Sequence, residues 1–239
     1  MKGNNQLRIN GERLWSTLMR SGEIGPGRAG GLRRLPLTDA DRDMRDQFVA
    51  WCEEAGCQVT VDRIGNIFAR RAGDDDSLPP VLIGSHLDTQ VAGGKYDGIL
   101  GVLSGLEVVR TLNDGGVATR RPIEVVCWTN EEGARFQPPM QCSGAFAGVM
   151  DVDSVLESRD DDGFVFKDEL ERIGYAGDAP VGGRDLDAYF ELHIEQGPEL
   201  EANNLPLGVV VGGYFSRGMV FEVLGENAHA GPTPMHIRR

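Results

Sequence analysis

Histidine and acidic residues gather at three places in the sequence, each at or soon after the end of a short apolar run. The three clusters are His86 with Asp88 and Asp97, Glu131 with Glu132, and His193 with Glu195. Imidazole and carboxylate groups are the side chains that bind divalent metal ions such as zinc. The carboxyl ends of the strands in an open α/β sheet meet at one crevice, so the clusters should converge there. The alternative is that all three are solvated loops, which requires three coincidences.

This set of ligands matches a two-metal hydrolase, in which one carboxylate bridges two cations about 3.5 Å apart. Asp97 suits the bridging position, because it precedes an apolar helix whose start would hold it rigidly. His86 and His193 are suitable ligands for one ion, and Glu132 is suitable for the other. Zinc is favoured, although manganese, cobalt and nickel accept the same ligands.

The adjacent glutamates can have separate roles. Neighbouring residues of an extended segment point in opposite directions. If Glu132 binds a metal ion, Glu131 can face the attacking water as general base and proton shuttle. Asp88 comes two residues after His86. Its carboxylate could accept the second ring N–H of that histidine and fix the tautomer.

The elements that must position these groups follow from the hydrophobic pattern. A short apolar run at residues 80–84 and two mainly apolar stretches at 123–129 and 188–194 predict buried strands. A sequence that is apolar on nearly every face predicts a buried helix at residues 99–112. Strands that alternate with helices over short connections indicate an α/β fold. We expect a mixed, mostly parallel sheet with helices on both faces.

The region before this core is predicted to contain a helix and two strands. Residues 38–41 have the pattern of a capping box, which starts a helix that ends near Gly56. Two alternating segments, 58–62 and 66–70, indicate strands joined by a tight turn.

The sequence changes character near residue 210, where it becomes rich in glycine. Residues 219–224 then alternate like a half-exposed strand. We therefore expect a catalytic domain over residues 1–209 and the beginning of a second domain over residues 210–239.

The charge and the terminal sequence argue against several classes of partner and location. Acidic residues outnumber basic ones, 37 to 24, and the formal net charge is −13. This sign argues against nucleic acid and anionic membrane surfaces as main partners. The amino-terminal residues lack an apolar signal region, and no window approaches about 18 consecutive apolar residues. We expect a cytoplasmic protein.

The cysteines fit that location. Cys52, Cys57, Cys127 and Cys142 are scattered, with no CxxC pair among them. Scattered thiols in apolar surroundings are typical of reduced cytosolic proteins. Cys142 has polar neighbours, so a nucleophilic role stays open, although no histidine motif accompanies it.

Five motifs together resemble one known family: SHLDT, KYDG, TNEEGARF, ELHIEQGP and AHAGPTPM. They are similar to the motifs of the di-zinc amidohydrolases and metallopeptidases related to carboxypeptidase G and aminoacylase. The closer resemblance is to the branch of N-carbamoyl-L-amino-acid hydrolases, β-ureidopropionases and allantoate amidohydrolases. His193 supports that branch, because the peptidase branches usually have a carboxylate at its position.

The resemblance implies a role for each candidate residue. His86, Asp97 and His193 hold one ion, Asp97 and Glu132 hold the second, Glu131 is the base, Gln196 contacts substrate, and His229 stabilises the oxyanion from across a dimer interface. It also implies two divalent ions per subunit and a homodimer. The architecture would be an α/β catalytic domain interrupted by a small α+β lid, which mediates dimerisation.

The implied reaction is hydrolysis of a linear, non-peptide C–N bond in a small ureido substrate. N-carbamoyl-L-amino acids are favoured, with the amino acid, carbon dioxide and ammonia as products. Allantoate and N-carbamoyl-β-alanine are the alternative substrates. The family pattern continues beyond Arg239, with the rest of the lid and a last catalytic segment that supplies a further histidine. An alternative of another class is therefore an inactive, truncated metal-binding relic or an interaction module.

Overall fold

The computed structural model describes residues 7–213, 219, 221–222 and 224–239. The contacts divide the chain into two compact units, one up to Ile194 and one from Glu195 onward. The predicted boundary near residue 210 stays a prediction. Among the described helices, none combines the length and the apolar composition needed to cross a membrane.

The first unit is built on a five-stranded sheet with the order β1-β2-β4-β3-β5. Its strands are β1 Gln58–Val61, β2 Ile67–Arg71, β3 Val81–His86, β4 Ile123–Trp128 and β5 Ala188–Phe190. β3 pairs in parallel with both β4 and β5, whereas β2 is antiparallel to both β1 and β4. Within this sheet, β2 therefore runs against the other four strands. The predicted mixed, mostly parallel sheet is confirmed.

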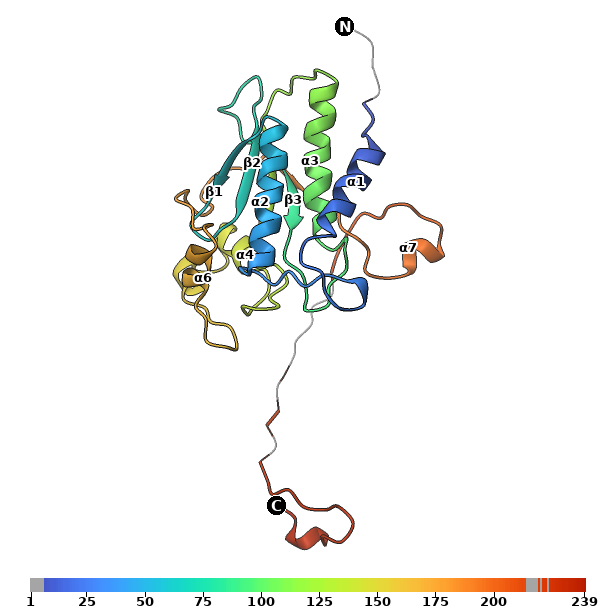
Figure 1. Cartoon of the computed structure of the whole chain (residues 1–239), viewed down its shortest axis with the longest axis vertical. Helices are drawn as coiled ribbons and strands as arrows, with labels where there is room; N and C mark the ends of the chain where they lie inside the picture. The colour runs from blue at the N-terminus through green and yellow to red at the C-terminus, as the bar shows by residue number, and fades with distance from the viewer. Residues whose placement is uncertain (1–6, 214–218, 220, 223) are drawn as a thin grey trace. The chain divides into compact units, whose positions relative to one another are not determined.

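Helices of very different lengths complete the first unit. The helices are α1 Gly11–Ser21, α2 Asp39–Glu54, α3 Ile99–Asp114, α4 Gln141–Phe146, α5 Val152–Leu156 and α6 Phe166–Arg172. α2 and α3 lie side by side across one face of the sheet, where α2 contacts β1 and β2 and α3 contacts β3 and β4 (Figure 1). This face carries the main hydrophobic core.

The second unit has little regular structure among its described residues. It contains the short helix α7 Glu199–Ala202 and a single 3₁₀ turn at Met235–Ile237. The strand predicted over residues 219–224 falls partly outside the described residues, because 220 and 223 are not among them.

The central strand β4 shows why the predicted runs are buried. All six of its residues are buried, and its five apolar side chains belong to one or the other of two hydrophobic clusters. Val125 and Cys127 face the helical core. Val126 and Trp128 belong to a smaller cluster that includes Phe146 of α4. A strand covered on both faces has no side exposed to solvent, so its sequence is mostly apolar. Glu124, the one charged residue of β4, is buried and forms ion pairs with Arg70 and Arg184.

The prediction for residues 188–194 was wrong in part. Of these residues, Ala188–Phe190 form a strand, and Phe190 is 60% exposed rather than buried. The physical reason is position in the sheet: within the part of the chain that is described, β5 pairs with β3 alone and forms an edge. An edge strand is covered less completely than a central one, so its side chains reach solvent.

Helix α2 begins as predicted, with Thr38 as its cap. The Thr38 Oγ1 accepts a hydrogen bond from the Asp41 N–H at 3.4 Å. The Asp41 carboxylate is buried and accepts from the Leu37 N–H, 2.9 Å away, and from the Arg45 Nε, 2.8 Å away. Arg45 then donates to the Gly65 carbonyl at 2.9 Å. This buried ion pair ties the helix to the turn between β1 and β2.

Replacing Arg45 by methionine should lower the free energy of unfolding by about 3–5 kcal/mol, because it leaves the Asp41 charge buried and unpaired. The Arg45 and Asp41 side chains are only 1% and 0% exposed. Arg42 on the same helix is 39% exposed, so Arg42→Met should cost about 1 kcal/mol or less. Urea denaturation of both variants measures the difference. Equal losses would contradict this account of the pair.

Candidate metal centre

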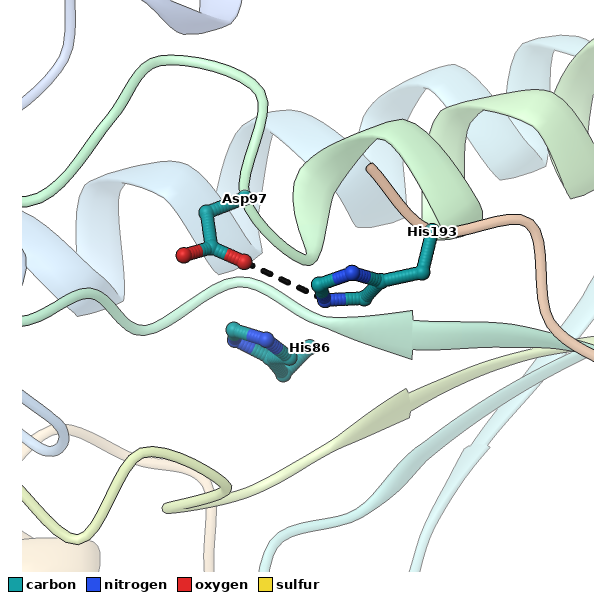
Figure 2. Close-up of side chains that lie close together, drawn as sticks. All are labelled: His86, Asp97 and His193. Carbon is teal, nitrogen blue, oxygen red and sulfur yellow. Dashed lines mark ion pairs between the residues drawn. The ribbon is translucent and has the colours of Figure 1, made fainter. Parts of the chain in front are cut away.

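Three potential metal ligands converge at the carboxyl ends of β3 and β5. His86 is the last residue of β3, Asp97 lies in the loop before α3, and His193 follows β5 (Figure 2). One ligand atom of each residue lies within 4.8 Å of those of the other two. The His193 Nε2 is 3.1 Å from the Asp97 Oδ1. Because β3 and β5 are parallel neighbours, their carboxyl ends place both histidines at the same edge.

Backbone carbonyls set the tautomers of both histidines. The His86 Nδ1 is 2.9 Å from the Asp88 carbonyl oxygen, and the His193 Nδ1 is 2.8 Å from the Ile194 carbonyl oxygen. A carbonyl oxygen only accepts, so each Nδ1 carries the proton and donates it. Each Nε2 is left with the lone pair that a metal ion needs. The two rings are thus preset as Nε2 ligands.

Gly98 allows the helix to come this close to His86. Its φ is +66°, and a Cβ atom built on it would lie 2.4 Å from the imidazole ring of His86. Any larger residue would therefore both strain the backbone and displace the histidine. The loop that carries Asp97 into α3 can approach His86 because a glycine follows Asp97.

Asp88 has a different partner from the one predicted. Its carboxylate Oδ1 is 3.9 Å from the His86 Nδ1, too far for a hydrogen bond. Instead, Oδ1 accepts from the Glu131 N–H and Oδ2 from the Glu132 N–H, both at 3.2 Å. Asp88 is 1% exposed, so these amides are the donors that satisfy its buried oxygens. Asp88 lies beside the other candidate residues as expected, but the predicted bond from its carboxylate to His86 is wrong.

The two glutamates do point to different partners, although their segment is not extended. Asn130 has φ of +52° and turns the chain two residues after the end of β4. The Glu131 Oε2 lies 3.4 Å from the His86 Nε2, and the Glu131 side chain is 30% exposed. The Glu132 Oε2 accepts from the Gln90 Nε2 at 2.9 Å. Glu132 is not among the three residues whose described ligand atoms lie within 4.8 Å of one another.

The electrostatics of this edge favour a positive ion. Burial opposes protonation of His86, but the charges of Asp88 and Glu131 outweigh it and raise the histidine's pKa. Burial raises the pKa of Glu131, and the neighbouring Asp88 and Glu132 charges add to the effect. Carboxylates that raise one another's pKa do so because their charges repel, and a divalent cation between them relieves this repulsion. Two Nε2 lone pairs and a carboxylate are also ligands that zinc prefers. The residues present therefore fit a metal ion.

Three further candidate residues lie in the second unit. Gln196 has φ of +56°. The Glu195 carboxylate accepts a hydrogen bond from the Leu200 N–H in α7 at 3.0 Å. The His229 Nδ1 accepts from the Gly231 N–H at 3.1 Å. The roles predicted for Gln196 and His229 stay predictions.

The thiol of Cys142 does not suit a nucleophile. It is fully buried in α4, and its Sγ donates to the Ile64 carbonyl at 3.7 Å. Burial raises the pKa of Cys142 well above the ordinary thiol value. A thiol that stays protonated at neutral pH is unreactive.

Sequence reasoning missed two polar residues beside the site. Gln90 donates to Glu132. Glu191 accepts from the Ser85 hydroxyl at 2.5 Å and from the Tyr189 hydroxyl at 2.6 Å. Glu191 lies between β5 and His193 in the chain. Its hydrogen bond with Ser85 of β3 therefore holds the segment that carries His193 against β3. The only feature of the sequence that pointed to Gln90 and Glu191 is that each lies within a few residues of a predicted metal ligand.

Comparison with known proteins identifies the family. The peptidase family M20/M25/M40 matches residues 82–236. The N-carbamoyl-L-amino-acid amidohydrolase of Rhizobium meliloti is 54% identical over 231 residues, which are 97% of this chain and 56% of that protein. A probable allantoate deiminase of Oryza sativa is 34% identical over 250 residues, with 98% of this chain and 50% of that protein covered.

A solved structure agrees with the fold. The hydantoinase/carbamoylase family amidase from Burkholderia ambifaria superimposes with a TM-score of 0.85 at 50% identity, covering 97% of this chain and 57% of that one. This chain spans between 50% and 57% of the length of these relatives. Because the family match extends from β3 through both candidate histidine ligands to the second unit, the chain belongs to peptidase family M20/M25/M40.

Proposed function

We propose that the protein is a metal-dependent amidohydrolase that converts N-carbamoyl-L-amino acids to the amino acid, carbon dioxide and ammonia. The observation that carries this proposal is the convergence of His86, Asp97 and His193, with Glu131 beside them. The name of the Rhizobium meliloti relative supports this substrate class. The allantoate deiminase relative keeps allantoate as the second candidate substrate.

Two divalent ions per subunit are part of the proposal, with zinc favoured and manganese, cobalt or nickel as alternatives. His86, Asp97 and His193 would hold one ion, and Asp97 with Glu132 would contribute to the other. Ions bound there would polarise the substrate carbonyl and lower the pKa of a bound water. The buried Glu132 Oε1, which has no hydrogen-bond partner among the described residues, supports this fit.

The chain's own residues divide the remaining work. Glu131 takes the proton of the attacking water and passes it to the leaving nitrogen, as a general base and then a general acid. Its partial exposure leaves it accessible to water and substrate. Asp88 holds the backbone of Glu131 and Glu132, and so keeps the base at a fixed distance from His86.

His229 is proposed to donate a hydrogen bond to the developing oxyanion in the partner subunit of a homodimer. Its Nδ1 accepts from the Gly231 N–H, so in the neutral ring the proton is on Nε2, which can then act as a donor. Such donors stabilise the charge that forms in the transition state. Gln196 is proposed to contact substrate. We further propose a cytoplasmic location without nucleic acid or membrane partners, consistent with the net charge of −13.

The substrate assignment is tested with the complete gene product. We expect kcat/KM for an N-carbamoyl-L-α-amino acid to exceed that for N-carbamoyl-β-alanine by about tenfold or more. These compounds differ by one methylene in the spacing between carboxylate and ureido nitrogen, so a site that binds both groups cannot align both compounds equally well. One methylene in a hydrophobic pocket is already worth about 10–200-fold. Activity should disappear on chelation and return with zinc or manganese. A higher kcat/KM for allantoate would favour the second candidate, and no turnover with ions bound would favour the non-catalytic alternative.

A further inference from the structure

The side chain of Gln90 connects the loop after β3 to the glutamate pair after β4. Its Nε2 donates to the Glu132 Oε2 at 2.9 Å, and the same nitrogen is 3.4 Å from the Glu132 carbonyl oxygen. Gln90 lies two residues beyond Asp88, whose carboxylate holds the backbone of the same pair. The loop after β3 therefore forms two hydrogen bonds with Glu132. Asp88 accepts from its backbone N–H, and Gln90 donates to its carboxylate.

The two oxygens of the Glu132 carboxylate have unlike surroundings. Oε2 is bound by Gln90, whereas Oε1 is buried and has no hydrogen-bond partner within the described part of the chain. A buried carboxylate oxygen without a donor is costly, unless a cation lies against it. Gln90 occupies one oxygen and so determines which oxygen faces inward. This is the arrangement by which an outer hydrogen bond orients a metal-binding carboxylate.

Gln90 is exposed, in contrast to the buried Asp88. Removing an exposed amide should change the stability of the fold by about 0.5 kcal/mol or less. Its effect on Glu132 can therefore be separated from an effect on folding, which is not possible for Asp88.

We propose that Gln90 is a positioning residue that orients the Glu132 carboxylate and presents its Oε1 to the second divalent ion. The proposal rests on the metal-binding role of Glu132 in the proposed function. The first ion, held by His86, Asp97 and His193, does not depend on this contact.

The test is a zinc titration of the complete gene product by calorimetry, with Gln90→Met as the variant. Methionine keeps the length of the side chain and removes the donor. We expect the weaker class of ion to lose about 10–100-fold in affinity, the range typical of outer-shell partners, while the tighter class changes less than about twofold. Gln58→Met, an exposed glutamine in β1, serves as the matched control and should change neither class.

The results that would overturn this inference can be distinguished from those that would also overturn the proposed function. Two classes of ion in the wild type, with both unchanged in Gln90→Met, would overturn this inference and leave the proposed function intact. Equal weakening of both classes, or a lowered unfolding midpoint, would indicate a general structural role and would also overturn it. A wild type that binds only one class of ion would overturn the two-ion function and this inference together.

Discussion

Replacing Glu131 by glutamine is expected to lower kcat of the complete gene product by about 10²-fold or more, the range of general acid–base catalysis. Glutamine has nearly the same shape but no basic carboxylate, so it cannot take the proton of the attacking water. Because the Glu131 N–H bond to Asp88 involves only the backbone of residue 131, this contact survives the substitution. The metal content should therefore stay near that of the wild type.

Glu132→Gln is the matched control for this substitution, because it is the same chemical change one residue further along. The Glu132 Oε1 is buried, whereas the Glu131 side chain is 30% exposed beside His86. Glu132→Gln should reduce the occupancy of one ion, measured by metal analysis after gel filtration. If Glu131→Gln lost metal and Glu132→Gln kept it while losing kcat, the two assignments would be reversed.

Much of this edge of the sheet could be predicted because it depends on a simple geometric rule. Strands that run in parallel end at the same side, so polar residues after β3 and β5 must meet. This rule, applied to the strands predicted at 80–84 and 188–194, places His86 and His193 at the same edge, and the pairing of β3 with β5 brings them together. The buried helix α3 followed equally from a sequence that is apolar on nearly every face.

The hydrogen bonds within the site could not be predicted in the same way. Asp88 binds the amides of Glu131 and Glu132 because the chain turns at Asn130, whose positive φ is uncommon outside glycine. Residue order shows neither that turn nor its distance from the loop after β3. Gln90 was missed for the same reason, since its partner is 42 residues away in sequence. The edge position of β5 also depends on which strands pair, rather than on its own composition.

The two preset histidines are the ligands on which the proposed metal centre depends most. Both His86 and His193 present Nε2 because a backbone carbonyl accepts from Nδ1. Loss of an outer-shell partner typically costs about 10–100-fold in metal affinity, so loss of a direct ligand should cost about 100-fold or more. His236→Ala is the matched control, because His236 is exposed and lies in the short helical turn Met235–Ile237.

The most direct test is the dissociation constant of the tightest zinc ion in the complete gene product, measured by competition with a chelator. We predict that His86→Ala and His193→Ala each raise this constant by about 100-fold or more, and that His236→Ala leaves it within about twofold. A wild-type protein that binds no zinc, or a His86→Ala variant that binds it as tightly as the wild type does, would contradict a metal centre at these strand ends.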